Sequence, residues 1–208
     1  MSYDNKKKLY RFFEQSGIIN ALKAEEIGEF FNPRNIDKNQ LLLREGQVNN
    51  EYLILEEGCM RAYTFDVTGI EITTAFYEAV EPVFEVASYF NRTPSRENIQ
   101  ALTGCKGWSI SYEKLNYIFH SIPEFREFGR SILVKGFAGL KVRMLSMITE
   151  TAEERYVALL AAKPGIFQYA PLKYIASYLG VTDTSLSRIR KERMKKNKSD
   201  INPNQVLL

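Results

Sequence analysis

The sequence is poor in the residues on which metal and redox chemistry depend. Its 208 residues include one histidine, His120, and two cysteines, Cys59 and Cys105. Enzymes built on a β-barrel usually hold a metal with two or more histidines and a carboxylate, and a single histidine excludes such a site. The sequence also contains no Ser/His/Asp or Cys/His set and no glycine-rich phosphate loop. We therefore expect no enzyme activity, no metal and no cofactor.

The sequence also lacks a long apolar run. No stretch approaches the eighteen or more apolar residues that span a bilayer, and the N-terminal MSYDNKKKLYRFF has no signal-peptide core. We expect a cytoplasmic protein without a membrane partner, in which Cys59 and Cys105 stay reduced and buried. Hydrophobic residues still make up 45% of the chain, which suffices for the core of one large or two modest domains.

Positive charge is concentrated towards the C-terminus. Residues 151–208 contain ten lysines and arginines against five acidic residues, a net charge of +5, whereas residues 1–150 contain eighteen against twenty, a net charge of −2. Seven of the basic residues fall within positions 188–198. A basic run is often only a solvated face, but beside a DNA-reading motif it is the expected surface for phosphate binding.

Such a motif lies in residues 172–193, LKYIASYLGVTDTSLSRIRKER, which predict two short helices joined by a tight turn. The apolar residues at helical spacing are Ile175, Leu179, Val181, Leu186 and Ile189. The small Ala176 lets the helices cross closely, and Gly180 accepts a positive φ in the turn. Thr182 offers its hydroxyl as the N-cap of the second helix. This spacing predicts a helix-turn-helix.

The second predicted helix has a polar, basic face roughly opposite its apolar side chains. Residues at steps of four, three and four form this face: Thr184, Arg188, Lys191 and Lys195. In a helix-turn-helix the second helix enters the major groove, where arginine binds guanine through two hydrogen bonds and serine or threonine pairs with several bases. The candidate DNA-binding residues are Thr182, Thr184, Ser185, Ser187, Arg188, Lys191 and Lys195.

Residues 36–111 predict short strands. Runs of four to eight residues alternate with turn signals that include Gly46 and Gly58, and this spacing is typical of an antiparallel barrel or sandwich. Two short helices are expected before the strands, within residues 6–31, where Pro33 ends the helical pattern. Residues 81–101 do not fit a plain strand and predict a short helix and a loop.

A long helix is expected from Pro123, after a short helical segment that ends at His120. Its apolar residues recur every four and three positions, as in an a/d heptad seam: Leu133, Phe137, Leu140, Met144 and Met147. Such a seam packs either against its own domain or against a second copy of the chain, and the length of the helix favours a homodimer. A further helix is expected over residues 151–162.

The chain thus predicts an α+β protein in three parts. Residues 1–122 form an antiparallel β-barrel with flanking helices, residues 123–150 a dimerisation helix, and residues 151–208 a winged-type helix-turn-helix domain, whose wing would come from the short tail after Met194.

This order of parts resembles the Crp/Fnr family of bacterial transcription regulators. The resemblance is strongest in Ile175-Ala176-Ser177-Tyr178-Leu179-Gly180-Val181-Thr182 and in Ser185-Leu186-Ser187-Arg188-Ile189, and it is looser in the barrel. It implies that the barrel is a cyclic-nucleotide-binding-like domain of the double-stranded β-helix, or jelly-roll, type, and that Arg188 reads bases.

The resemblance also indicates which effectors to expect. Family members that bind cyclic AMP carry a cassette that begins Gly-Glu-Leu and ends Arg-Ser-Ala, in which the glutamate holds the ribose and the arginine neutralises the phosphate. This chain has Phe84-Glu85-Val86 and Ser95-Arg96-Glu97. The glycine is replaced, the arginine is displaced by one residue, and Glu97 places negative charge beside the expected phosphate. We therefore expect an effector other than cyclic AMP.

Metal-based sensing is not expected either. Iron–sulfur members of the family need cysteines near the N-terminus, and none precedes Cys59. Haem-sensing members need an axial ligand such as histidine, and we expect His120 to pack under the long helix as a structural residue.

Two interpretations of the barrel interior remain open. In the first, polar residues at its mouth bind a small polar effector: Arg61, Tyr77, Glu85, Tyr89, Arg92 and Arg96. In the second, the aromatic residues, with phenylalanine, tyrosine and tryptophan at 12% of the chain, simply fill the barrel while the charges stay at the surface.

The leading hypothesis for the whole chain is a homodimeric, sequence-specific DNA-binding transcription regulator. Its partners would be double-stranded DNA, a small-molecule effector and, if it activates transcription, RNA polymerase. The alternative is a small-molecule or protein-binding barrel module that no longer reads DNA, which the short tail and the negative charge of Asp183 would favour.

Overall fold

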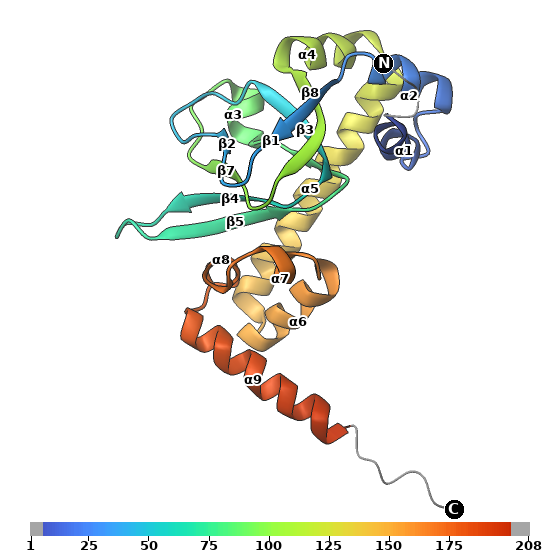
Figure 1. Cartoon of the computed structure of the whole chain (residues 1–208). Helices are drawn as coiled ribbons and strands as arrows, with labels where there is room; N and C mark the ends of the chain where they lie inside the picture. The colour runs from blue at the N-terminus through green and yellow to red at the C-terminus, as the bar shows by residue number, and fades with distance from the viewer. Residues whose placement is uncertain (1–5, 201–208) are drawn as a thin grey trace, which may run out of the picture. The chain divides into compact units, whose positions relative to one another are not determined.

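The computed structural model describes residues 6–200, in which two helices precede a block of strands and six helices follow it (Figure 1). The chain divides into two units, residues 1–144 and residues 145–208. The first unit contains every strand of the described residues, and the second contains the end of one long helix and four shorter helices. The mixed helix and sheet class expected from the sequence is confirmed.

Two short helices begin the first unit, as expected. They are α1 (Lys7–Glu14) and α2 (Ala21–Gly28). The first strand begins earlier than the expected start at residue 36. It is β1 (Asn32–Ile36), and it includes Pro33. This strand lies at the edge of its sheet and pairs only with β8 (Cys105–Ser111), where a sheet tolerates the missing N–H of proline.

The strands form two four-stranded antiparallel sheets, in the orders β1-β8-β3-β6 and β2-β7-β4-β5. The remaining strands are β2 (Leu41–Leu43), β3 (Glu51–Glu57), β4 (Met60–Phe65), β5 (Glu71–Tyr77), β6 (Glu81–Val83) and β7 (Asn98–Ala101). Within residues 6–200 no hydrogen-bonded ladder joins one sheet to the other. The expected barrel is therefore an open jelly-roll-like sandwich.

Strand β3 separates two hydrophobic cores. Leu53 and Leu55 point into the core between the sheets, whereas Tyr52 and Ile54 belong to a second core on the outer face of β3. Successive side chains of a strand point to opposite faces. A strand that is buried on both faces therefore needs an unbroken apolar run, which the segment YLIL supplies.

The second core is covered by helices of the first unit. Figure 1 shows α1, α2 and α4 (Tyr112–Ser121) gathered around the first half of α5 (Pro123–Thr149). Phenylalanines dominate the packing, and the ring centroids of Phe13 and Phe128 lie 5.5 Å apart in an edge-to-face arrangement. The expectation that His120 packs under the long helix was wrong, because this residue in the last turn of α4 is exposed.

Two local features of the sandwich agree with the sequence. Cys59 and Cys105 are both buried thiols, as expected. Gly46 and Gly58 both have positive φ, at +83° and +103°. A Cβ atom at Gly58 would lie 2.6 Å from the Sγ atom of Cys105. The turn before β4 therefore needs glycine for its conformation and for its space.

The second unit is helical throughout the described residues. After the end of α5 it contains α6 (Ala152–Ala162), α7 (Ile166–Tyr169), α8 (Leu172–Tyr178) and α9 (Asp183–Asp200). The short α7 was not expected. The tail expected to supply a wing instead continues α9 to residue 200, and residues 201–208 lie outside the described part. In residues 6–200 no helix combines the length and apolar character needed to cross a membrane.

Candidate functional site

The turn between α8 and α9 closes α8 through two backbone hydrogen bonds. The N–H of Val181 donates to the carbonyl of Ala176 at 3.0 Å, and the N–H of Gly180 donates to the carbonyl of Ser177 at 3.1 Å. Gly180 has a φ of +68°. This pair of bonds around a left-handed residue is a Schellman motif. A Cβ atom at Gly180 would also lie 2.7 Å from the Cε atom of Met147, so the turn is closely packed.

The start of α9 is capped as the sequence predicts. The Oγ1 atom of Thr182 accepts a hydrogen bond from the backbone N–H of Ser185 at 3.2 Å and lies 3.0 Å from the Oγ atom of Ser185. The two hydroxyls therefore hydrogen-bond to each other and stabilise the first turn of α9. Of the seven DNA-binding candidates, these two have an evident role in building the helix.

The other five candidates lie together on the outer face of α9. Leu186 is fully buried and Ile189 is nearly so, which fixes the inner face of the helix. The outer side chains are all exposed: Thr184, Ser187, Arg188, Lys191 and Lys195. A capped, well-packed helix thus presents one arginine, two lysines and two hydroxyls to solvent.

One positioning residue of this unit escaped the sequence analysis. Arg155 in α6 donates from Nε to the carbonyl of Leu179 at 3.1 Å and from Nη1 to the carbonyl of Glu150 at 2.6 Å. It thereby satisfies carbonyls at the ends of α8 and α5. Its sequence neighbourhood gives no signal of this, because Leu179 lies 24 residues away. The helix start beside it was predictable, since Thr151 and Glu154 form a capping box.

The seam expected along α5 is open to solvent. Phe137 is 73% exposed and Leu140 is 64% exposed. The remaining seam residues are also exposed: Leu133, Met144 and Met147. A contiguous row of large apolar side chains is seldom left bare on a monomer. This exposure does not support the interpretation that the seam packs against its own domain.

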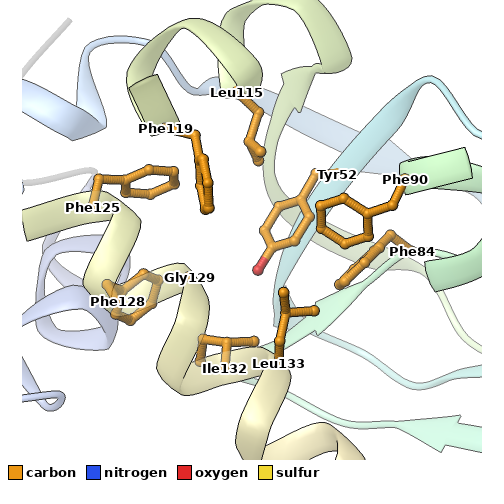
Figure 2. Close-up of a pocket in the computed structure, with 10 residues that line it drawn as sticks. All are labelled: Tyr52, Phe84, Phe90, Leu115, Phe119, Phe125, Phe128, Gly129, Ile132 and Leu133. Atoms are coloured by element: carbon orange, nitrogen blue, oxygen red, sulfur yellow. The ribbon is translucent and has the colours of Figure 1, made fainter. Parts of the chain in front are cut away.

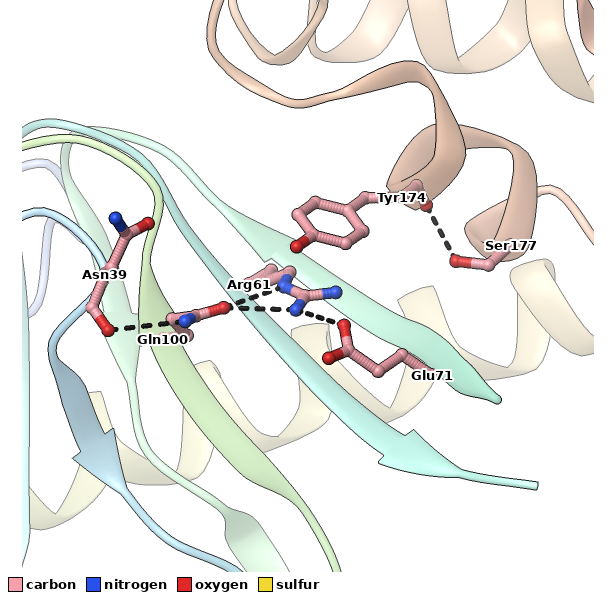
Figure 3. Close-up of polar contacts among 6 residues, drawn as sticks. All are labelled: Asn39, Arg61, Glu71, Gln100, Tyr174 and Ser177. Carbon is pink, nitrogen blue, oxygen red and sulfur yellow. Dashed lines mark hydrogen bonds and ion pairs between the residues drawn. The ribbon is translucent and has the colours of Figure 1, made fainter. Parts of the chain in front are cut away.

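The six candidate effector residues do not form one group. Arg61 points to the outer face of its sheet, because its neighbours Met60 and Ala62 fill the core between the sheets. There it donates hydrogen bonds to Gln100 of β7 and Glu71 of β5, as Figure 3 shows. Figure 3 also includes α8 of the second unit, in which the hydroxyl of Ser177 donates to the carbonyl of Tyr174 at 3.0 Å.

Tyr89 and Arg92 belong to the helical side of the sandwich. Tyr89 is buried in the second core. Arg92 donates from Nη1 to the carbonyl of Asn49 at 2.8 Å and from Nη2 to the side-chain oxygen of Asn50, and its guanidinium lies 3.8 Å from the ring centroid of Tyr112. These contacts fix the loop after α3 (Val86–Asn91) and leave the guanidinium engaged with protein.

Glu85 is likewise engaged, because it caps α3. Its two carboxylate oxygens accept hydrogen bonds from the backbone N–H groups of Ala87 at 2.9 Å and Ser88 at 2.6 Å. Arg96 is exposed, and its carbonyl accepts a hydrogen bond from Thr64 at 2.9 Å. The glutamate and arginine of the expected cassette are therefore a helix cap and a surface residue.

Carboxylates surround the remaining candidate, Tyr77. Burial raises the pKa of its hydroxyl, and the nearby charges of Glu97, Glu81 and Glu85 raise it further. Burial also raises the pKa of the Glu97 carboxyl, the charge of Glu85 adds to this, and Arg143 opposes it. Glu85 and Glu97 therefore place negative charge in the segment of the expected cassette, and this charge disfavours an anion nearby.

Metal ligands do not gather in the described part of the chain. Across residues 6–200 no three histidine, cysteine, aspartate or glutamate side chains are grouped closely enough to hold an ion.

Comparison with known proteins identifies the fold. Residues 33–121 match the family model of the cyclic nucleotide-binding domain. No curated protein sequence matches the chain. Among solved structures, FixK2 from Bradyrhizobium japonicum aligns with a TM-score of 0.69 and 15% identity over 80% of this chain and 86% of that one.

Two further structures give similar alignments. The c-di-GMP responsive global regulator CLP from Xanthomonas campestris aligns with a TM-score of 0.66 and 16% identity over 86% of this chain and 93% of that one. A protein assigned to the Crp/Fnr family of transcriptional regulators, from Eubacterium rectale, aligns with a TM-score of 0.65 and 15% identity over 89% and 88%. At these identities the likeness is one of fold.

Residues 33–121 therefore match a cyclic nucleotide-binding domain, and the chain has the fold of Crp/Fnr transcription regulators. This confirms the resemblance that the sequence motifs indicated, and the matched proteins are regulators rather than enzymes.

Proposed function

We propose that the chain is a sequence-specific DNA-binding transcription regulator that acts as a homodimer. The observation that carries this proposal is the second helix of the helix-turn-helix. It begins at a capped turn, buries Leu186 and Ile189, and presents Arg188 with two lysines on its exposed face. A rigid helix with such a face suits the major groove of DNA.

The side chains of α9 have different roles in DNA binding. Arg188 lies in the second turn, where it is long enough to pair with a guanine edge, and Thr184 and Ser187 flank it on the same face. Lys191 and Lys195 follow along the helix and bind phosphates. Thr182 and Ser185 contribute by holding the start of the helix, since their hydroxyls already contact each other.

Selection of bound sites from a random duplex pool tests DNA reading. We expect enrichment of a two-fold symmetric motif. Arg188→Ala should then weaken binding to the selected site by about 1–3 kcal/mol and relax its base preference. Lys195→Ala should weaken binding to selected and random duplexes alike and reduce the salt dependence. Equal losses on both duplexes for Arg188→Ala would remove it from the base-reading role.

Arg11→Ala provides a matched control. Arg11 is an exposed arginine on α1 in the first unit, so its loss removes the same charge from a surface that takes no part in the proposed contacts. We expect DNA binding to be unchanged. The alternative function, a barrel module that has lost DNA binding, predicts that no motif is enriched with or without cell extract as a source of effector.

The exposed seam of α5 is the proposed dimer interface. Pairing two copies along Phe137 and Leu140 buries their apolar surface and places two recognition helices on half-sites about 34 Å apart, or a multiple of this. Leu140→Glu places a charge in the seam and should give monomers by light scattering.

Val142→Glu is the matched control for this interface. Val142 is 67% exposed on the same helix, but it stands two residues from Leu140 and hence on a different face. The variant should remain dimeric. Dimers that persist in Leu140→Glu would show that the copies pair elsewhere.

We further propose that the effector is a small molecule other than cyclic AMP. Glu97 and Glu85 make the cassette region negative, and no cassette arginine faces a phosphate position, because Arg96 is on the surface. An effector would act by favouring one of two dimer arrangements that differ in the spacing of the recognition helices. Calorimetric titration with cyclic AMP should give no saturable heat, and submillimolar binding would contradict this.

A further inference from the structure

A pocket with an apolar lining lies on the helical side of the sandwich. It is formed by β3, by Phe84 just before α3, by Phe90 near the end of α3, and by the adjoining turns of α4 and α5, all within the first unit (Figure 2). Ten residues line it: Tyr52, Phe84, Phe90, Leu115, Phe119, Phe125, Phe128, Gly129, Ile132 and Leu133. The lining includes neither the glutamate nor the arginine of the expected cassette, Glu85 and Arg96, and no residue of the DNA-binding face.

The size and lining of the pocket restrict what it can hold. The cavity has a volume of about 30 Å³ and is open to solvent on one side. A nucleotide is too large for this site, and a single ring fits only if it lies partly in the open mouth of the pocket. No charged side chain lines it. A charged molecule would lose its hydration there without gaining a partner, so the occupant is neutral.

The polar group of the lining is the hydroxyl of Tyr52. Figure 2 shows the ring of Tyr52 entering from β3 with its hydroxyl pointing into the pocket. Behind it, the ring centroid of Tyr89 lies 6.2 Å away, and the hydroxyl of Tyr89 is buried with no hydrogen-bond partner among residues 6–200. Buried polar groups usually have partners. Tyr89 does not line the pocket, so the polar group that an occupant can reach is the hydroxyl of Tyr52.

We propose that this pocket binds a small neutral aromatic molecule that carries one hydrogen-bonding group. The ring contacts the phenylalanines, of which Phe90 is 44% exposed at the rim, and the polar group hydrogen-bonds to the hydroxyl of Tyr52. The walls are close, because a Cβ atom at Gly129 would lie 2.9 Å from Cε2 of Phe119.

Because the pocket lies against α5, such a ligand can affect the arrangement of the dimer. This part of the proposal rests on the proposed function as a dimeric regulator. Ile132 and Leu133 line the pocket, and Leu133 is also the first residue of the exposed seam. A ligand that bridges β3 and α5 adds contacts to one position of the helix relative to the sheet. It therefore biases the dimer arrangement without contacting Glu85 or Arg96 of the expected cassette.

The test titrates the full-length protein, without DNA, with benzyl alcohol, toluene and benzoate. We expect saturable binding of benzyl alcohol in about the millimolar range by calorimetry, with shifts of the Ile132 and Leu133 methyl signals in NMR spectra. Benzoate, which is charged, should not bind. Tyr52→Phe should weaken benzyl alcohol binding about threefold to tenfold and leave toluene binding unchanged.

Tyr117→Phe is the matched control, because Tyr117 is an exposed tyrosine of α4 that does not line the pocket. It should bind benzyl alcohol like the wild type. Absence of saturable binding, shifts that avoid Ile132 and Leu133, or equal binding of benzoate would overturn the proposal. If Tyr52→Phe does not fold, two measurements on the wild type still test the proposal. They are the preference for benzyl alcohol over toluene and the shifts of the Ile132 and Leu133 methyl signals.

A second measurement separates this proposal from the proposed function. With benzyl alcohol at saturation, the affinity for the selected DNA site should change by about threefold or more if the pocket and the dimer are coupled, within the usual range of allosteric effects. Binding of benzyl alcohol with unchanged DNA affinity supports the pocket and overturns the coupling. A protein that binds benzyl alcohol but selects no DNA site supports the pocket and contradicts the proposed function.

Discussion

The turn between α8 and α9 and the segment between β6 and β7 are both irregular, yet different parts of the chain hold them in place. In the turn, the hydrogen bonds that close α8 and cap α9 join residues at most five positions apart, within 176–185. In the segment, Asn49 lies 36 residues from its partner Glu85, 39 from Ser88 and 43 from Arg92. The bonds that form the turn are encoded locally, although Arg155 also donates to the Leu179 carbonyl at its edge, whereas the segment depends on the distant Asn49.

The largest expected effect comes from removing that distant residue. The side-chain oxygen of Asn49 accepts a hydrogen bond from the N–H of Glu85 at 2.7 Å, and its amide donates to the carbonyl of Glu51 at 2.7 Å. Asn49 is only 3% exposed, so Asn49→Ala leaves two backbone groups without these partners. We expect a loss of about 2–4 kcal/mol in unfolding free energy. Hydrogen exchange of amides in β3 and α3 measures it.

Asn91→Ala is the control for this comparison. Asn91 is an exposed residue at the end of α3, and its replacement should change the unfolding free energy by less than about 0.5 kcal/mol. If Asn49→Ala were equally mild, the segment would be held by its own local contacts, and the contrast with the turn would fail.

A smaller effect is expected from the locally encoded turn. Gly180→Ala forces a side chain into a backbone with φ of +68° and places its Cβ atom 2.7 Å from the end of Met147. The methionine can move, so we expect the cost to come mainly from the backbone, about 1–2 kcal/mol. Exchange of amides in α8 and α9 should rise while that of β3 does not change.

Gly104→Ala is the control for the turn. Gly104 does not have positive φ, and a Cβ atom there would meet nothing within 4 Å, so little change is expected. Faster exchange in β3 for Gly180→Ala would mean that the turn is coupled to the first unit and is not an independent local structure.

The same contrast explains which features could be predicted from the sequence. Gly180 and Thr182 act within five residues, and local patterns predicted the roles of both correctly. The helix over residues 151–162 was also predicted, although its capping box of Thr151 and Glu154 was not. The heptad spacing on α5 predicted which side chains share a face. The general fold followed from the order of these local patterns.

Features set by distant partners were missed or misplaced. The start of β1 at Asn32 depends on its place at a sheet edge, the exposure of His120 depends on how α4 meets its neighbours, and the role of Arg155 depends on Leu179. Arg61 is a different case. The alternation of Met60, Arg61 and Ala62 along β4 already indicates that the arginine points away from the core, so a local signal was available.

The smallest expected effects concern two glutamates, one in each unit, whose pKa values shift in opposite directions. Burial holds the pKa of Glu97 above its ordinary value of 4.5, whereas the backbone and side chain of Thr151 hold that of Glu154 below it. Ionised Glu97 therefore disfavours the folded state, and this penalty develops as pH rises from its unfolded to its folded pKa. Ionised Glu154 favours the folded state, and this contribution is lost as pH falls through its folded pKa.

Glutamine variants of the two residues measure whether each ionised carboxylate stabilises or destabilises the folded state. Near pH 7, Glu97→Gln should raise the unfolding free energy and slow exchange in the first unit, because it removes a buried charge beside Glu85. Glu154→Gln should lower the unfolding free energy and speed exchange in α6, because it weakens the capping box. Well below pH 4.5 both differences should shrink as the wild-type carboxyls become protonated. Two shifts of the same sign would mean that Glu97 is held by favourable contacts, as Glu154 is, and that the cassette region is not the negative environment that disfavours a phosphate.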